Sequence, residues 1–172
     1  IVTSDLAARI AEKYGCRVIE VLTGFKYIGE QIGLLEKAGE EDRYVFGFEE
    51  SYGYLAGTYI RDKDAVVSSM LICEMTAYYK EKGRTLLDVL HSLYREHGCY
   101  RHFQVSAQFE GAEGMAAMNR LMTSLRTDRP ATIAGLKVIR FADYEESTLY
   151  DLAAGTQTVI DLPKSNVLSF GL

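Results

Sequence analysis

The sequence predicts a layered α/β domain followed by a smaller β-α-β unit, and three observations lead to that fold class. Apolar runs of strand length alternate with segments of helical periodicity in residues 1–100. The pattern restarts after Gly98 with a further strand, helix and strand. The 172 residues, 48% of them hydrophobic and 25% charged, have an ordinary globular composition. We therefore divide the chain into residues 1–100 and 101–172.

The first unit is expected to open with a helix, a strand and a second helix. Ser4 is a candidate N-cap and Gly15 a candidate end for the opening helix, whose apolar residues recur at helical spacing. Alternation in residues 17–22 predicts a short strand, which Thr23-Gly24 ends. Helical periodicity then resumes and continues to about Gly39.

A compact apolar run in residues 44–48 predicts a buried strand, and a polar loop of about fifteen residues is expected to follow it. Residues 65–83 then read as one helix ending at a glycine. Thr85 and Asp88 have the spacing of a capping box, which predicts another helix ending near Gly98.

The second unit is expected to contain a strand in residues 102–109, a helix over 115–125 and a strand in 136–141. Residues 145–157 are polar and predict irregular structure. The short strand candidate at 166–170 comes directly before the end of the sequence. Because a domain seldom ends on an apolar strand, we expect this unit to be cut short.

Charge and cysteine content restrict the class of protein. The net charge of -5 and the scattered basic residues argue against nucleic-acid binding. No apolar run is long enough for a membrane span, and a secretory leader is not evident, so a cytoplasmic protein is expected. Cys16, Cys73 and Cys99 form no C-x-x-C pair. Cys73 lies in the most apolar helix and is expected to be buried.

Three loops carry the residues suited to chemistry: 23–26, 49–53 and 61–64. The first two follow predicted strands and are therefore expected to share a crevice. The adjacent carboxylates and the serine in 49–53 could bind vicinal sugar hydroxyls, and the lysines of the other two loops could neutralise a phosphate. The alternative interpretation, a solvated acidic turn with solubilising lysines, stays open on these residues alone.

The string FGFEESYG, with LTGFKYIG before it and YIRDKDAV after it, resembles the sugar-binding region of the α-D-phosphohexomutases, the phosphoglucomutase and phosphomannomutase family. The resemblance covers the whole chain. It implies that residues 1–100 are a three-layer α/β third domain and that residues 101–172 are a linker and the truncated start of an α+β fourth domain.

The resemblance assigns roles to individual residues. Glu49 and Ser51 match the loop residues that hydrogen-bond the sugar 3- and 4-hydroxyls. Thr23 and Gly24 match the turn that lines the same pocket. Lys63 matches a lysine that acts as proton donor or acceptor near the transferred phosphoryl group. Neighbouring positions such as Glu50 and Lys26 receive no role from the resemblance.

The resemblance also implies the parent reaction, an intramolecular phosphotransfer that interconverts hexose 1-phosphate and hexose 6-phosphate through a phosphoserine. Magnesium and hexose 1,6-bisphosphate would be its cofactors. This chain has no T-A-S-H-N-P serine loop, no D-G-D-x-D-R metal loop and no R-P-S-G-T-E-P-like phosphate loop. It is therefore expected to bind neither cofactor and to be inactive alone, with hexose phosphate and the remaining domains of the parent as partners. A preference for glucose or mannose stays open.

No metal site is expected from the remaining acidic and imidazole groups. Asp62 and Asp64 lack a third acidic ligand, and His91, His97 and His102 are too irregularly spaced for one helical face.

Two other functions stay open. The chain could be a non-catalytic sugar-phosphate binding or regulatory module, which the missing motifs permit. It could also be a protein-interaction domain that uses the methionines of the helix at 115–125, although methionines at that spacing usually pack in a core.

Overall fold

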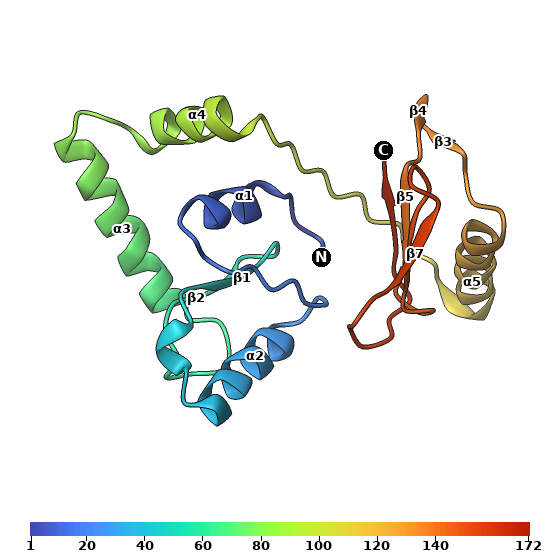
Figure 1. The fold of residues 1–172 in the computed structure, drawn as a ribbon, viewed down its shortest axis with the longest axis horizontal. Coiled ribbons are helices and arrows are strands. Elements are labelled where there is room, and N and C mark those ends of the chain that lie inside the picture. The colour runs from blue at the N-terminus through green and yellow to red at the C-terminus, as the bar shows by residue number, and fades with distance from the viewer. The chain divides into compact units, whose positions relative to one another are not determined.

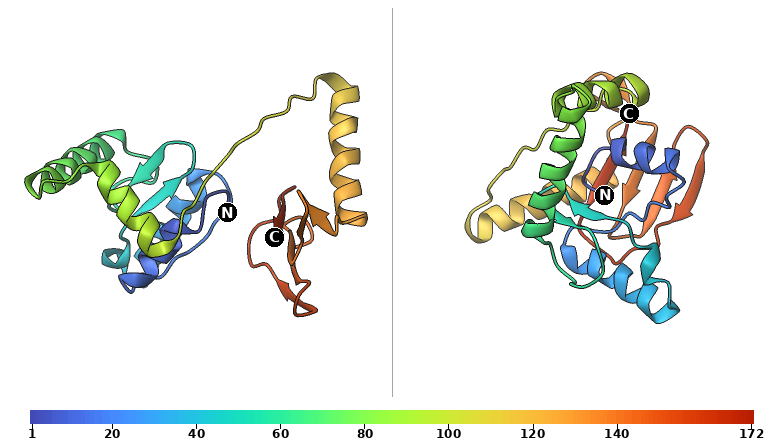
Figure 2. Two further views of the ribbon diagram at one scale, coloured as in Figure 1. Left: turned by 90° about the horizontal axis from the view of Figure 1, so that it is seen from above. Right: turned by 90° about the vertical axis from the view of Figure 1, so that its left-hand side faces the viewer.

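The computed structural model, which describes residues 1–172, contains helices and short antiparallel strands (Figure 1). The chain divides into two units, Ile1–Phe103 and Gln104–Leu172. Both units are mixed in secondary structure, as the sequence predicts. Figure 2 shows the same elements from two further sides.

The four predicted helices of the first unit are confirmed. They are α1 (Leu6–Lys13), α2 (Phe25–Ala38), α3 (Ala65–Glu81) and α4 (Leu86–His97), and a short 3-10 helix η1 (Glu41–Arg43) follows α2. Local signals account for their ends. Gly39 closes α2 in the left-handed conformation at φ 66°. The Asp64 side chain accepts hydrogen bonds at the start of α3, and Thr85 and Asp88 form the predicted capping box of α4.

The only sheet of the first unit is an antiparallel hairpin of β1 (Gly47–Glu49) and β2 (Gly53–Leu55), with Glu49 paired to Gly53. The chain reverses over three residues, and Tyr52 takes a left-handed φ of 62°. The prediction of a buried strand at 44–48 followed by one long loop was therefore wrong in detail. Val45 is 67% exposed, because the strand begins only at Gly47 and turns back at once.

The predicted strand at residues 17–22 does not form. Val18 and Ile19 are exposed, and the hydrogen bond made here joins the Ile1 amino group to the Val21 carbonyl oxygen at 3.2 Å. Alternating side chains mark a segment that suits a strand, but a strand also needs the N–H and C=O groups of a neighbour.

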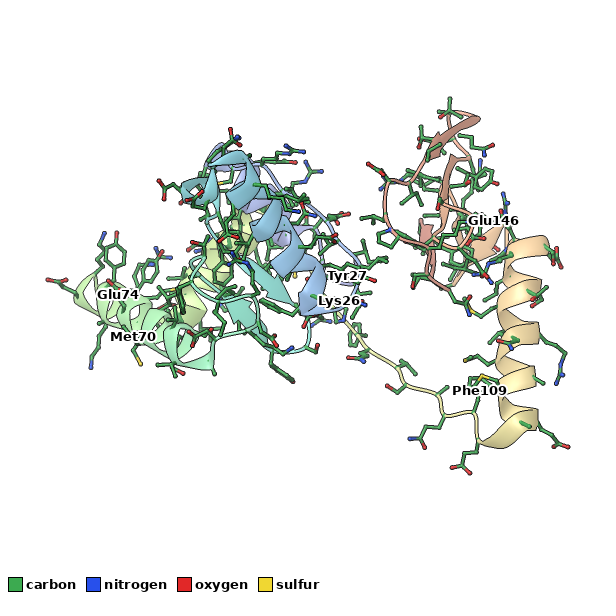
Figure 3. The ribbon with its side chains drawn as sticks, turned by 90° about the horizontal axis from the view of Figure 1, so that it is seen from below. Lys26, Tyr27, Met70, Glu74, Phe109 and Glu146 are labelled. Atoms are coloured by element: carbon green, nitrogen blue, oxygen red, sulfur yellow. The ribbon has the colours of Figure 1, made fainter.

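The core of the first unit is small and lies beneath the hairpin. Phe25, Ile28 and Ile32 of α2 pack with Leu55 of β2, and Tyr44 is partly buried against them. No residue of α3 is buried. Met70 and Glu74, one turn apart, both project outward from this helix (Figure 3).

Cys73 is exposed, which corrects the expectation that it is buried. The composition of α3 suggested burial, but burial depends on what packs around a helix, and the main contacts of α3 are with β2 and α4.

The second unit consists of one long helix, a small hairpin and a four-stranded antiparallel sheet in the order β7-β6-β5-β8. Its elements are α5 (Gly111–Thr127), β3 (Thr132–Ile133), β4 (Leu136–Lys137), β5 (Arg140–Asp143), β6 (Thr148–Asp151), β7 (Thr156–Val159) and β8 (Leu168–Gly171). The helix and the strand at the end of the chain were predicted correctly. The single strand predicted at 136–141 was wrong in detail, because these residues form the end of one hairpin, β4, and the start of β5 in a different sheet.

Two predictions for this unit were wrong. Residues 102–109 form no strand, so the unit is not β-α-β. Residues 145–157 are not irregular, because they form β6 and the start of β7. Their polar composition hid this hairpin, since one face of an antiparallel sheet can be polar.

Phe141 and Ala142 of β5 are buried in the second unit, and Arg129 lies over the Phe141 ring at 4.5 Å from its centroid. Met118 and Met122 of α5 are partly buried.

Candidate functional site

Glu49, the last residue of β1, joins the first two predicted loops. Its Oε1 accepts a hydrogen bond from the Gly24 backbone N–H at 2.7 Å, and its side chain is only 13% exposed. Gly24 is the N-cap of α2 and has φ 125°, a conformation that favours glycine. The carboxylate is thus anchored at the start of a helix, where unpaired N–H groups favour negative charge.

Lys63 approaches the other oxygen of this carboxylate from the third predicted loop. Its ammonium lies 3.9 Å from Glu49 Oε2, 3.3 Å from Asp62 Oδ1 and 5.4 Å from the centroid of the Phe25 ring. The lysine side chain is half exposed. This charge is therefore held near the largely shielded Glu49 carboxylate but remains accessible to an anion from solvent.

Gly53 explains how these groups come so close. A Cβ atom at this buried position would lie 3.0 Å from Lys63 Cδ, 3.2 Å from Glu49 Oε2 and 3.3 Å from Phe25 Cδ2. The absence of a side chain at this position thus accommodates three protein side chains. Phe25 was missed as a site residue, although it stands inside the LTGFKYIG string.

The other predicted residues are less closely involved. Ser51 and Tyr52 are exposed in the hairpin turn, and Thr23 is exposed beside Gly24. The Ser51 and Thr23 hydroxyls make no hydrogen bond to Glu49 or Lys63. Glu50 points instead to His102, with its Oε1 3.5 Å from the imidazole Nε2. The structure thus brings Gly24, Glu49 and Lys63 together, with the Ser51 hydroxyl open to solvent.

The two aspartates of the third loop already have partners. The Asp62 carboxylate accepts a hydrogen bond from the Lys63 N–H at 2.8 Å, which lowers the Asp62 pKa. Asp64 accepts hydrogen bonds from the Tyr59 hydroxyl and from two backbone N–H groups of α3. The bond from Tyr59 is the main reason that the pKa of Asp64 is lowered and that of Tyr59 is raised. No group of three or more histidine, cysteine, aspartate or glutamate side chains in the chain could hold a metal ion.

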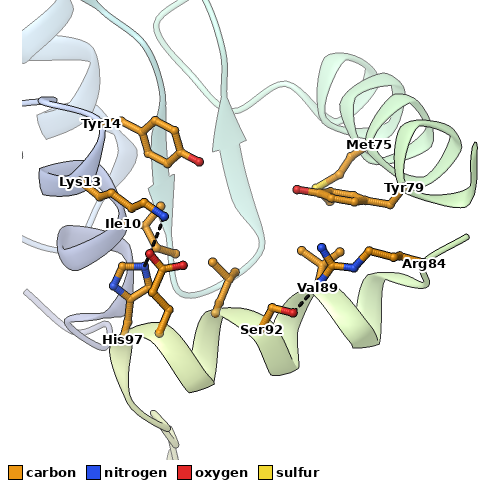
Figure 4. A pocket seen from close by; sticks show the side chains of 11 residues that line it. Ile10, Lys13, Tyr14, Met75, Tyr79, Arg84, Val89, Ser92 and His97 are labelled. Carbon is orange, nitrogen blue, oxygen red and sulfur yellow. Dashed lines mark hydrogen bonds and ion pairs between the residues drawn. The ribbon is translucent and has the colours of Figure 1, made fainter. Parts of the chain in front are cut away.

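A cavity of about 330 Å³ lies between α1, α3 and α4, and none of the predicted site residues lines it (Figure 4). Lys13 and Glu96 form an ion pair in its wall, and Arg84 donates a hydrogen bond to the Ser92 hydroxyl at 2.6 Å. The Lys13, Glu96 and Arg84 side chains thus already have partners within the wall, and the candidate site remains the one at the hairpin. No helix of the chain has the length and apolar character of a membrane span.

Comparison with known proteins relates this arrangement to one family. Residues 1–97 match the family described as phosphoglucomutase/phosphomannomutase, alpha/beta/alpha domain III. That description agrees with the α/β fold class predicted for the first unit.

Several curated relatives extend the similarity through the second unit. A phosphoglucomutase of Staphylococcus haemolyticus is 42% identical over 168 residues, which are 98% of this chain and 30% of the relative. Phosphoglucomutases of Staphylococcus epidermidis and Staphylococcus aureus are 39% identical over the same length. The chain thus spans about 30% of the length of these relatives. No solved structure matches it.

Proposed function

We propose, since this chain belongs to the phosphoglucomutase and phosphomannomutase family, that it forms the sugar-recognition part of a longer phosphohexomutase. The parent would interconvert hexose 1-phosphate and hexose 6-phosphate by phosphoryl transfer from a phosphoserine, with a hexose bisphosphate as intermediate. One observation carries the proposal: the Glu49 carboxylate is fixed by the Gly24 N–H on one oxygen and lies beside the Lys63 ammonium on the other.

Glu49 is suited to sugar hydroxyls. A carboxylate accepts several hydrogen bonds, and only Oε1 is used by the backbone. The 3.9 Å gap between Oε2 and the Lys63 ammonium exceeds a hydrogen bond, so a hydroxyl can compete for this oxygen. The exposed Ser51 hydroxyl, two residues along, can donate or accept a further bond.

Lys63 is suited to the phosphoryl group. Phosphoryl transfer depends mainly on positioning and on neutralising charge at the transferred group. A half-exposed ammonium at the site can pair with phosphate oxygens and give a proton to, or take one from, the sugar oxygen that exchanges the phosphoryl group. Contacts to the 3- and 4-hydroxyls would be nearly preserved when the hexose turns over, as two opposite orientations of the sugar require.

Magnesium does not fit the residues of this chain. The Asp62 and Asp64 carboxylates are occupied by hydrogen bonds, and no third acidic ligand lies with them. We therefore assign the metal and the phosphoserine to other parts of the parent, and this chain alone is expected to be inactive. The three cysteines are free, which is compatible with a reducing cytoplasm.

A coupled mutase assay with glucose 1-phosphate, glucose 1,6-bisphosphate and magnesium tests the proposal on the full-length protein and on this chain. Activity in the full-length protein alone is expected. Activity in neither would favour the alternative, a non-catalytic sugar-phosphate binding module, and activity in this chain would contradict the proposal.

Lys63→Met tests the catalytic role within the full-length protein. Loss of a proton-transfer group is expected to lower kcat by about 10²- to 10⁴-fold. Lys37→Met, which removes an exposed lysine from the last turn of α2, is the matched control and should leave kcat unchanged. A rise in KM with unchanged kcat would reduce Lys63 to a substrate clamp.

A further inference from the structure

The segment that carries Lys63, residues 56–64, rests directly on helix α2 at Gly29. A Cβ atom at Gly29 would lie 2.7 Å from the Arg61 carbonyl oxygen and 3.3 Å from Arg61 Cβ. Such a contact to backbone cannot be relieved by rotating a side chain, so this approach is open only to glycine. Gly29 is buried, and it stands in the middle of a 14-residue helix, where glycine is otherwise unfavourable.

The Arg61 side chain fastens the same contact. Its guanidinium donates to the Thr58 carbonyl oxygen within the segment and pairs with the Glu36 carboxylate near the end of α2. The hydrogen bond from Arg61 lowers the pKa of Glu36. The segment is thus held to α2 both through its backbone at Gly29 and through an ion pair two turns later.

A second anchor lies on the other side of Lys63. The Asp64 N–H donates to the Tyr54 carbonyl oxygen of β2 at 2.9 Å, and the Asp64 side chain caps α3. Lys63 therefore stands between a contact to α2 at Arg61 and a contact to β2 at Asp64. The backbone from which the Lys63 side chain extends is therefore held on both sides.

The same face of α2 serves both the segment and the site. Phe25 and Gly29 are four residues apart and so lie above one another on the helix surface. Phe25 lies beneath the Lys63 ammonium, while Gly29 lies beneath the Arg61 backbone. A change in the distance between the segment and α2 would therefore move the ammonium relative to both Phe25 and Glu49.

We propose that Gly29 is a positioning residue: by letting the Arg61 backbone lie on α2, it sets the place of the Lys63 ammonium beside Glu49. That the place of the ammonium matters for catalysis rests on the proposed function of Lys63. That Gly29 sets this place does not depend on the proposed function.

The helix provides a matched control. Gly33 lies one turn after Gly29, and a Cβ atom there would meet nothing within 4 Å. Gly33→Ala should therefore be neutral or slightly stabilising, because alanine is the better helix former. Gly29→Ala adds the same methyl group to the same helix and differs only in meeting Arg61.

The direct test compares lysine acylation by acetic anhydride in full-length wild type, Gly29→Ala and Gly33→Ala, read for each lysine by mass spectrometry, with Lys37 as internal reference. In Gly29→Ala, acylation of Lys63 is expected to rise about two- to fivefold, the factor that corresponds to loss of a partly exposed ion pair. Gly33→Ala should match wild type. An unchanged Lys63 rate in a folded Gly29→Ala protein would overturn the inference.

If Gly29→Ala fails to fold, Glu36→Gln tests the same contact without adding an atom. It removes the partner of Arg61 and is expected to raise Lys63 acylation in the same direction by a smaller factor. An unchanged rate in this variant would contradict the inference in turn.

Kinetics then separate this inference from the proposed function. Gly29→Ala is expected to lower kcat about 10- to 100-fold, as small displacements of a reacting group do, and to add nothing in a Lys63→Met background. An equal loss in both backgrounds would overturn the positioning role. Full activity of Lys63→Met would contradict only the proposed role of Lys63, and the acylation result would still decide the role of Gly29.

Discussion

Two carboxylates in this chain, Asp143 in the second unit and Glu49 in the first, are both shielded from solvent but differ in how their oxygens are used. Asp143 is 1% exposed; its Oδ2 accepts from Arg126 Nε at 3.0 Å and its Oδ1 from the Glu145 N–H at 3.0 Å. Glu49 is 13% exposed, with one firm hydrogen bond and a lysine at 3.9 Å.

The difference separates a structural carboxylate from one that can bind a ligand. Burying a charge is costly unless its hydrogen-bonding capacity is filled, and Asp143 meets that condition entirely within the protein. Glu49 meets it only on one oxygen. The remaining capacity lies next to an accessible ammonium, which is the arrangement expected of a polar ligand site.

The largest effect is expected from Asp143→Ala. Removing the buried member of this ion pair leaves the largely shielded Arg126 charge with only the exposed Glu145 carboxylate as an ionic partner, and should lower the free energy of unfolding by about 3 to 5 kcal/mol. Urea unfolding and hydrogen exchange of β5 would measure it. Glu145→Gln, which removes the exposed partner of the same arginine, is the control and should cost no more than about 1 kcal/mol. An equal loss of stability in Asp143→Ala and Glu145→Gln would mean that burial does not make Asp143 more important for stability than Glu145.

Glu49→Gln should show the opposite balance, with loss of activity rather than of stability. In the full-length protein, losing a charge-assisted hydrogen bond to the sugar should lower kcat/KM by about 10- to 150-fold, equivalent to about 1.5 to 3 kcal/mol. Glu50→Gln, the neighbouring carboxylate turned toward His102, should have a smaller effect. Unchanged kcat/KM in Glu49→Gln would discard this residue as a sugar ligand.

Tyr44 in the first unit is like Asp143 in that its polar group is paired within the protein. Its hydroxyl donates a hydrogen bond to the Leu55 carbonyl oxygen at 3.1 Å beside the core. Tyr44→Phe should cost about 1 kcal/mol of stability near neutral pH. Burial raises the pKa of Tyr44 to about 12, so the hydroxyl stays protonated to a higher pH in the folded protein than in the unfolded chain.

The sign of the pH dependence follows from that shift. The contribution of the Tyr44 hydroxyl to the free energy of unfolding is fully present below the ordinary pKa of 10.0. It is lost as the pH rises from there through the folded-state pKa of about 12. Thermal unfolding across this range should show the difference between wild type and Tyr44→Phe shrinking. A constant difference would mean that the hydroxyl does not titrate with unfolding.

The smallest effect concerns Asp88, an exposed carboxylate whose partners are entirely local. The hydrogen bond from the Thr85 side chain, and then that from its backbone, lowers the pKa of Asp88 below its ordinary value of 3.8. The contribution of the Asp88 carboxylate to stability is therefore present above pH 3.8 and is lost as the pH falls through the lowered pKa. Hydrogen exchange of α4 should accelerate in this acidic range in wild type and change less in Asp88→Asn. Identical acid profiles in wild type and Asp88→Asn would show that the ionised capping box does not stabilise α4.

Much of this protein follows from the sequence alone because the determining interactions are local. Helical periodicity and the capping pair Thr85 and Asp88 predicted the helices, since these signals act within a few residues along the chain. The strings around Glu49 and Lys63 indicated the family and the candidate residues through their resemblance to its sugar-binding region.

Tertiary structure alone decided the rest, because strands and sites need partners that are distant in sequence. Residues 17–22 alternate like a strand and yet form none, whereas the polar residues of β6 do pair with β5. No local pattern predicts that Gly53 makes room for Glu49, Lys63 and Phe25, or that Gly29 carries the Arg61 backbone. Steric contact and charge pairing act through space, so the position of the Lys63 ammonium beside Glu49 is a property of the fold.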